Sequence, residues 1–225
     1  MKVNSIFEGT PQKYLFNNKE IITSIFKEPK EKLISENLEL ILNKQANLKH
    51  HGGNFKAIYS YSLEHYDYWK TILSPDLCVP GVFGENLTTE DLDEAKIFIG
   101  DQIKIGSMIL EVSQPRIPCS MLNFKLNRND AVKLFVESQK TGIYWKIIVD
   151  GEIKKGDKIH RLDQLDSVPK IKLSELVPLL NNRTVSKDLL SRVLDFPEMD
   201  PKIVNKALEI KDKRISMKKV NKYRN

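Results

Sequence analysis

Short runs with period-two alternation, separated by tight-turn signals, fill most of the first 165 residues of this chain. Residues 144–149 form one such run, and the Asp150-Gly151 pair after it predicts a two-residue hairpin. Gly100-Asp101 carries similar turn chemistry. Many short strands with turns between them are typical of a closed or nearly closed β-barrel, because closure removes exposed strand edges.

Helical spacing occurs twice within this β-rich part and then takes over the rest of the chain. Apolar side chains recur at three- and four-residue intervals over residues 63–73 and 130–138, which predicts two helices that decorate the barrel. Beyond Pro169, three helices are predicted by the spacing of Leu173, Leu176, Val177 and Leu180, by a Thr184 or Ser186 cap, and by Asp200-Pro201. We therefore expect a mainly β fold with α elements: a barrel domain over residues 1–165, and a small three-helix bundle with a basic tail over residues 170–225.

The net positive charge of the chain comes entirely from its helical end. Residues 1–165 hold 22 basic and 22 acidic side chains, so the net charge of +6 comes from residues 166–225. A basic tail can contact nucleic acid or anionic surfaces, but this one lacks the interleaved aromatic rings that single-strand binding uses, so a solvated helix end is favoured. The chain shows no apolar run of about 20 residues, no secretory signal and only two cysteines, which predicts a cytoplasmic protein.

The run Gln114-Pro115-Arg116-Ile117-Pro118-Cys119 places a cysteine just after two prolines and close to an arginine. Proline fixes its own backbone and disfavours helix at the residue before it, so Cys119 is expected on a stiff, extended loop. A nearby guanidinium favours the thiolate, which is the form that binds soft metals or attacks electrophiles. Cys78 has no basic neighbour and is expected to be a small buried hydrophobe.

Two other clusters combine glycines with polar side chains. His51-Gly52-Gly53 and Lys56 can present an imidazole, bare backbone N–H groups and a cation at one place, and a plain hairpin turn is the alternative. In the loop over residues 80–89, Asn86 and Thr88 supply uncharged donors and acceptors. The alternative for this loop is that its side chains bond its own backbone.

Four pieces of the sequence, taken in this order, resemble the MOSC family, named for the C-terminal domain of molybdenum cofactor sulfurase. They are His51-Gly52-Gly53 with Lys56-Ala57, Gly84-Glu85-Asn86-Leu87-Thr88-Thr89, Ile99-Gly100-Asp101 and the run from Gln114 to Cys119. The resemblance covers residues 1–165. The helical end looks like the three-helix domain of one bacterial branch, which includes the enzyme that reduces 6-hydroxylaminopurine. Lys146 stands where the family often has an arginine, and lysine lacks the bidentate fork of a guanidinium.

The resemblance implies a molybdenum cofactor, which is a pterin whose dithiolene binds the metal and whose far end carries a phosphate. It implies that Cys119 is the metal ligand and that Cys119 and His51 are catalytic, with His51 as a proton donor. The residues expected to bind the cofactor are Cys119, Arg116, His51, Gly52, Gly53, Lys56, Asn86 and Thr88.

The implied activity is a two-electron reduction that cleaves the N–OH bond of N-hydroxylated compounds such as hydroxylaminopurine-type base analogues. The expected partners are this small substrate and an external flavin or iron–sulfur protein, for which the basic helices form a docking face. We expect neither a membrane nor a nucleic acid as partner, and a homodimer is one open option for the assembly.

Three alternatives stay open on the sequence alone. Cys119 can carry sulfur as a persulfide, in which case no molybdenum is needed. The chain can also hold the cofactor as a carrier without any turnover. In the third alternative the tail over residues 211–225 binds nucleic acid, and deleting the tail then removes the affinity whereas changing Cys119 does not.

Overall fold

The computed structural model describes residues 1–16, 18–42, 52–162 and 169–222, with side chains described as far as residue 214. The strands in this part of the chain are β1 (Lys2–Glu8), β2 (Gln12–Phe16), β3 (Lys19–Thr23), β4 (Glu28–Lys30), β5 (Lys32–Glu36), β6 (Glu39–Leu40), β7 (Ile58–Ser62), β8 (Leu87–Glu90), β9 (Gln102–Ile105), β10 (Met108–Pro115), β11 (Ile143–Val149), β12 (Glu152–Lys154) and β13 (Ile159–Arg161). The α-helices are α1 (His65–Trp69), α2 (Ser120–Leu126), α3 (Ala131–Ser138), α4 (Leu173–Leu180), α5 (Lys187–Asp195) and α6 (Pro201–Lys222), and three short 3₁₀ helices are η1 (Asn54–Lys56), η2 (Pro75–Leu77) and η3 (Glu94–Lys96).

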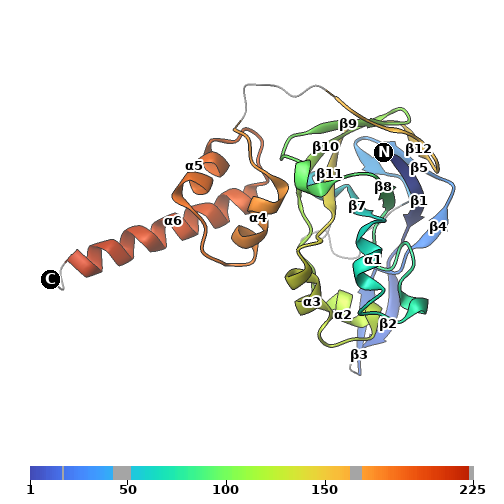
Figure 1. The fold of residues 1–225 in the computed structure, drawn as a ribbon, viewed down its shortest axis with the longest axis horizontal. Helices are drawn as coiled ribbons and strands as arrows, with labels where there is room; N and C mark the ends of the chain where they lie inside the picture. Colours follow the sequence, from blue (N-terminus) through green and yellow to red (C-terminus); the bar gives the residue numbers. More distant parts are fainter. Residues whose placement is uncertain (17, 43–51, 163–168, 223–225) are drawn as a thin grey trace.

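Eight strands form one curved sheet in the order β13-β9-β10-β11-β7-β8-β1-β4 (Figure 1). Its neighbours are antiparallel except for β7 and β8, which run parallel. The inward faces of these strands carry large apolar side chains, and Ile58, Leu110 and Trp145 are among those that water hardly reaches. Burial of this apolar surface is the main stabilising force for the sheet.

The prediction was a closed or nearly closed barrel, and the described residues have the nearly closed form, because their strand ladder does not close along its full length. Strands β4 and β13 are the two ends of the sheet. Strand β4 covers one edge of β1 only from Ile6 to Glu8. The remaining part of that edge meets the residues before β13 through an isolated bridge between Lys2 and Lys158. The sheet therefore curls almost into a barrel, but its ends meet at a bridge and not along a full ladder.

The hairpin predicted at Asp150-Gly151 does not form between the strands that flank it. Strand β11 pairs with β10 and β7, whereas β12 pairs with β5. Gly151 is required here for close packing, since a Cβ on it would lie 2.3 Å from Ser107 Oγ. The Gly151 amide donates to Ser35 Oγ at 3.1 Å and so joins the chain to β5. The predicted hairpin turn is therefore wrong, because β11 and β12 pair with different strands and the chain between them makes no turn.

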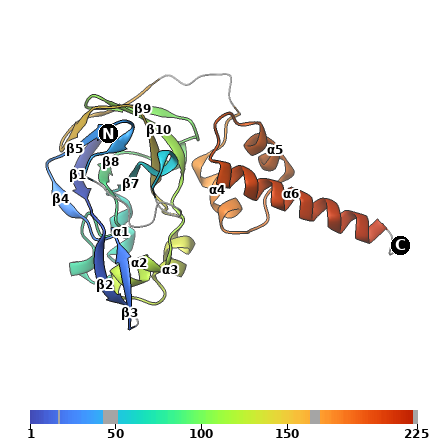
Figure 2. The same ribbon diagram turned by 180° about the vertical axis from the view of Figure 1, so that it is seen from behind.

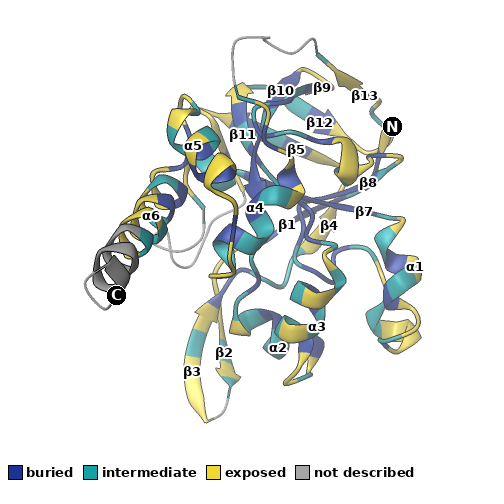
Figure 3. Cartoon of the chain, turned by 60° about the vertical axis from the view of Figure 1, so that its left-hand side comes forward, coloured by how far each residue is buried: buried dark blue, intermediate teal, exposed yellow. Residues whose placement is uncertain are grey.

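Three short helices cover one end of the sheet. Helices α1 and α3 confirm the two predicted within the β-rich part, and α2 was not predicted. Helix α2 spans only two turns and buries Leu122 and Leu126, which is too little periodicity to detect in sequence. Its Phe124 packs against Tyr14 and Phe16 of the β2–β3 hairpin, with ring centroids 5.7 and 4.8 Å apart. The hairpin projects from the sheet with its other face largely exposed (Figure 3).

Helices α4, α5 and α6 form the predicted C-terminal group, on the other side of strands β10 and β11 from β1 (Figures 1 and 2). Their apolar faces join the core of the sheet in one continuous cluster that includes Leu176, Val193 and Ile203. Helix α6 runs to residue 222, further than the predicted end at Ile210, because no helix-breaking residue follows there. The predicted division between two domains falls near residues 163–168, which lie outside the described residues, and it stays a prediction.

A search of the described residues finds no helix with the length and apolarity that crossing a membrane requires.

Candidate active site

A cavity of about 340 Å³ opens between the β2–β3 hairpin and the strand ends of the large sheet. Its volume is within the range of small-molecule sites. Segments far apart in the sequence meet on its wall. The residues that line it are Ile21, Ile22, Thr23, Ser24, Ile25, Lys27, Gly52, Lys56, Tyr59, Gly84, Asn86, Arg116, Ile117, Cys119, Met121 and Tyr144. The structure therefore brings together five of the eight residues that were predicted to bind the cofactor. They are Gly52, Lys56, Asn86, Arg116 and Cys119.

Cys119 lies on the wall of this cavity in extended backbone, with φ −118° and ψ 176°, directly before α2. This confirms the conformation predicted from the prolines. The sulfur is neither fully buried nor fully exposed. It shares electrostatic interactions with Arg116 and Lys56, which come from two other parts of the chain. The site thus holds one soft sulfur ligand beside two cations.

Arg116 is held in place by the protein as well as facing the cavity. Its side chain is 6% exposed and donates a hydrogen bond to the Phe83 carbonyl. The guanidinium lies 4.7 Å from the centre of the Tyr59 ring and 5.4 Å from that of Phe135. A buried guanidinium stays charged and stacks well on aromatic faces. Arg116 therefore presents a fixed positive charge next to Cys119.

Two lysines on the cavity wall are affected by burial. Burial lowers the pKa of Lys56, and this effect outweighs the negative charge of Asp200, which raises it. Burial and the neighbouring Lys125 ammonium lower the pKa of Lys27 to about 7, against the opposing influence of Glu85. The physical cause is the same at both positions, since a low-dielectric environment penalises the ammonium form.

Glu85 is fully buried behind the cavity and organises the loop there. Its Oε1 accepts hydrogen bonds from Tyr66, from the Gly81 amide at 2.7 Å and from the Thr88 hydroxyl at 3.0 Å. Its Oε2 has no hydrogen-bond partner among the described residues. The Glu85 carboxylate interacts electrostatically with Lys27 and Lys125, so buried charges of both signs lie next to the cavity.

Asn86 lines the cavity, yet both ends of its side chain serve the fold. Its Oδ1 accepts from the Tyr59 amide and its Nδ2 donates to the Phe7 carbonyl, each at 3.1 Å. The residue therefore links β7 to β1. Thr88 is not on the cavity wall, and its hydroxyl is bonded to Glu85. We leave Thr88 out of the site proposed below.

The remaining predicted residues have different outcomes. Gly52 has a φ of 86° and lines the cavity, whereas Gly53 precedes η1 and does not line it. His51 lies outside the described residues, so its role as a proton donor stays a prediction. Lys146, at the position where an arginine is common, does not line the cavity and pairs with Glu111 at 2.6 Å.

Sequence analysis missed Lys27 and the hairpin residues that complete the wall. Lys27 follows a β-branched run that was recognised only as a strand. Nothing in its neighbourhood distinguishes it from the other basic residues of the chain. Tyr59 and Tyr144, whose rings are 5.1 Å apart, were also not assigned to a site. Aromatic residues in strands are more often core, and only the fold shows that these two rings border a cavity.

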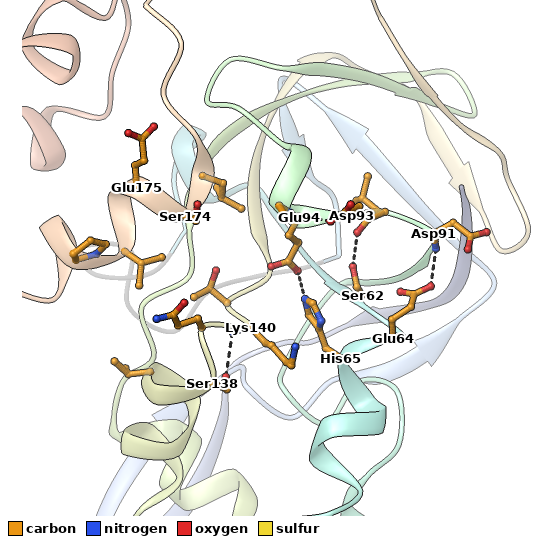
Figure 4. A pocket seen from close by; sticks show the side chains of 18 of the residues that line it. Ser62, Glu64, His65, Asp91, Asp93, Glu94, Ser138, Lys140, Ser174 and Glu175 are labelled. Atoms are coloured by element: carbon orange, nitrogen blue, oxygen red, sulfur yellow. Dashed lines mark hydrogen bonds and ion pairs between the residues drawn. The ribbon is translucent and has the colours of Figure 1, made fainter. Parts of the chain in front are cut away.

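A larger groove of about 880 Å³ lies where α1, α3, α4 and residues 91–95 meet (Figure 4). His65 and Glu94 point toward each other across it, with Nε2 2.9 Å from Oε1. Glu64 accepts from the Asp91 amide at 2.8 Å. None of the residues predicted for the site lines this groove. It holds no cysteine and none of the predicted cofactor-binding residues, so its larger size does not make it the candidate active site.

The donors in the smaller cavity fit a molybdenum cofactor. Cys119 offers the thiolate that a soft metal centre accepts, and Lys56 and Arg116 suit an anionic pterin phosphate and dithiolene. Within the described residues, no group of three or more His, Cys, Asp or Glu side chains is placed to hold a metal ion.

Comparison with known proteins agrees with this geometry. The MOSC domain matches residues 47–160. The chain is 35% identical over 165 residues to the uncharacterized protein YflK of Bacillus subtilis, covering 72% of this chain and 73% of YflK. It is 30% identical over 184 residues to a protein named "Reductase" of Gibberella moniliformis, covering 80% of this chain but only 32% of that protein. It is 33% identical over 128 residues to YiiM of Escherichia coli, covering 56% of this chain and 57% of YiiM.

Solved structures share the fold. The crystal structure of YiiM from Geobacillus stearothermophilus aligns with a TM-score of 0.73 at 23% identity, covering 92% of this chain and 97% of that one. The structure of YiiM from Escherichia coli aligns with a TM-score of 0.68 at 21% identity, covering 93% and 92%. At these identities the structures show a common architecture and no more. Together with the sequence matches, they establish that this chain is a member of the MOSC domain family.

Proposed function

We propose that this protein binds a molybdenum cofactor in the Cys119 cavity and reduces N-hydroxylated compounds of the hydroxylaminopurine type. The observation that carries the proposal is the position of the Cys119 sulfur, which faces a small-molecule cavity beside Arg116 and Lys56. Membership of the MOSC family supports the cofactor. The relative named "Reductase" supports the class of reaction.

Different residues of the cavity wall would bind the metal, the anionic parts of the cofactor and the substrate. Cys119 would supply a sulfur ligand to the metal. Arg116, Lys56 and the Gly52 backbone would hold the anionic parts of the cofactor through charge-assisted hydrogen bonds. The rings of Tyr59 and Tyr144 border the same space and offer flat apolar surface to a heteroaromatic substrate.

The proposed reaction converts an N-hydroxylated amine to the amine and water, and it consumes two electrons and two protons. When bound, the cofactor supplies the redox chemistry that such a cleavage of an N–O bond requires. The electrons come from an external flavin or iron–sulfur protein. The chain itself fixes the substrate, keeps bulk water from the apolar wall and delivers protons to the leaving oxygen.

We propose that the electron donor is an acidic protein that docks beside the start of α6. Asp200 Oδ2 accepts from Gln114 Nε2 at 2.7 Å, which ties this helix to the loop that carries Cys119. Both Asp200 and Lys202 interact electrostatically with Lys56 on the cavity wall. Exposed lysines extend from there along α6, and a donor of opposite charge would be steered to this face.

The test is to express the protein in cells that make the cofactor and to measure molybdenum and pterin in the purified product. Cys119→Ala is the variant, and Cys78→Ala is its matched control, because Cys78 is the other free cysteine and lies outside the cavity wall. We expect the wild type and Cys78→Ala to hold both components and to reduce hydroxylaminopurine. We expect Cys119→Ala to lose molybdenum and activity.

Other results would identify the alternatives. A protein that carries persulfide on Cys119 and no molybdenum is a sulfur carrier or transferase. A protein that holds the cofactor but reduces no N-hydroxylated compound with any electron donor is a cofactor carrier. Either result would overturn the proposed reductase activity.

A further inference from the structure

Lys27 is on the cavity wall although sequence analysis gave it no role. It lies between β3 and β4, half-buried, and lines the same cavity as Cys119 and Arg116. Its stem passes over Gly9, where a Cβ would lie only 3.0 Å from Lys27 Cγ and 2.8 Å from the Ser24 carbonyl oxygen. The absence of a side chain at Gly9 therefore leaves room for the lysine to reach the cavity.

Charged groups from four parts of the chain surround the Lys27 ammonium. Glu8 faces it from the end of β1, Glu85 from the loop before β8, Lys125 from α2 and Arg116 from the loop after β10. The two cations and burial disfavour its protonated form, and the two carboxylates favour it. The balance leaves the pKa of Lys27 at about 7, so it gains and loses a proton readily near neutral pH.

Building on the proposed function, we propose that Lys27 is the residue that donates a proton to the hydroxyl oxygen of the N-hydroxylated substrate as the N–O bond breaks. The bond pair leaves with the oxygen, and the proton from the ammonium group converts the departing hydroxide to water. Two electrons from the external reductant and a second proton from solvent restore the nitrogen as an amine. The neutral lysine is then protonated again from solvent.

The other cations nearby are less suited to this step. Lys125 donates to the carbonyls of Ile25 and Gly81 at 2.9 and 2.8 Å, and it is not on the cavity wall. Arg116 does not release its proton in proteins. Lys56 interacts with Cys119 itself and lies 5.7 Å from the centre of the Tyr144 ring, which suits a charge that holds the cofactor.

The test uses Lys27→Arg, which keeps the positive charge but is too weak an acid to donate. Lys13→Arg is the control, because Lys13 is exposed on the neighbouring β2–β3 hairpin and pairs with Glu20 at 3.0 Å. Both variants and the wild type are loaded with cofactor in cells and assayed for molybdenum, pterin and hydroxylaminopurine reduction across pH. In parallel, the cofactor-free proteins are ¹³C-methylated on lysine, and each amine is titrated by NMR.

We expect Lys27→Arg to hold wild-type amounts of molybdenum and pterin yet to lose about 100-fold or more in kcat, the usual contribution of a general acid. We also expect the alkaline fall in the wild-type pH profile to vanish in this variant. Because an anionic cofactor favours the ammonium form, the fall in the loaded wild type is expected at or above the pH found for the cofactor-free protein. In the cofactor-free wild type, one lysine resonance absent from Lys27→Arg is expected to titrate near pH 7.

Three results would overturn the role of Lys27 while leaving the proposed function in place. They are an unchanged kcat in Lys27→Arg, a loss of molybdenum from it, and a Lys27 resonance that titrates near 10 as surface lysines do. A loaded wild type that reduces no N-hydroxylated compound would overturn the proposed function, and with it this role.

Discussion

Removing the Lys27 amine is expected to stabilise the cofactor-free protein, and to do so most at low pH. The pKa of Lys27 falls from its ordinary 10.5 to about 7 because the folded protein buries the ammonium group. Between these two pH values the unfolded chain binds a proton that the folded protein does not. The free energy of unfolding therefore rises with pH in this window, and below pH 7 the full cost of burying the charge is present.

The size of this change in the free energy of unfolding follows from the lowered pKa of Lys27. One pKa unit corresponds to about 1.4 kcal/mol, and the group is already half-deprotonated at pH 7, so full linkage would add roughly 2.3 kcal/mol between pH 7 and pH 9. Lys27 is only half-buried, and water screens part of this, so about half of that value is expected. Lys27→Met keeps the stem and removes the charge. The variant should be more stable than the wild type at pH 7, and this difference in the free energy of unfolding should shrink by about 1.2 kcal/mol by pH 9.

Urea unfolding of both proteins at pH 6, 7, 8 and 9 measures this difference. The comparison isolates Lys27, because every other titrating group is common to the two proteins. A constant difference across pH would show that the pKa of Lys27 is ordinary in the fold. A variant that is less stable than the wild type at pH 7 would show that the attraction of Glu8 and Glu85 outweighs burial.

Three further predictions test the framework and the docking face. Asn86→Ala should lower the free energy of unfolding by roughly 2–4 kcal/mol in urea titration, because the Tyr59 amide and the Phe7 carbonyl both lose a buried partner. Gly142→Ala should lower Tm, since φ is 68° and a Cβ would lie 2.5 Å from the Ser60 carbonyl oxygen; an unchanged Tm would contradict this backbone geometry. With a protein electron donor, reduction should slow as salt rises from 0.05 to 0.5 M, whereas with reduced methyl viologen it should change little; equal salt responses would refute charge-steered docking at α6.

Much of the site was visible in the sequence because it depends on local chemistry. The prolines around Cys119 fixed an extended backbone there, and the structure has φ −118° and ψ 176° at this residue. Glycine permits positive φ, and both glycines after His51 use this freedom, since Gly52 and Gly53 have φ values of 86° and 77°. Asn86 was predicted to bind the cofactor, whereas the structure shows both ends of its side chain linking two strands.

The errors in the fold arose where a local signal has more than one tertiary outcome. The Asp150-Gly151 motif forms no turn; Gly151 packs against Ser107, and the strand that follows, β12, pairs with β5. A turn motif is a local preference, and pairing with a distant strand overrides it here. The sequence left closed and nearly closed barrels open for the same reason, since closure depends on how β4 shares the edge of β1.

The sequence by itself determined the β-rich class, the helical end and the stiff loop that presents Cys119, because these follow from periodicity and from the backbone preferences of proline and glycine. The tertiary structure decided which charges surround that sulfur. Lys27, Lys56 and Arg116 come from separate segments and meet only because the curved sheet and the hairpin pack around one cavity. The pKa of a lysine depends on burial and on such neighbours, and neither is encoded near it in the chain.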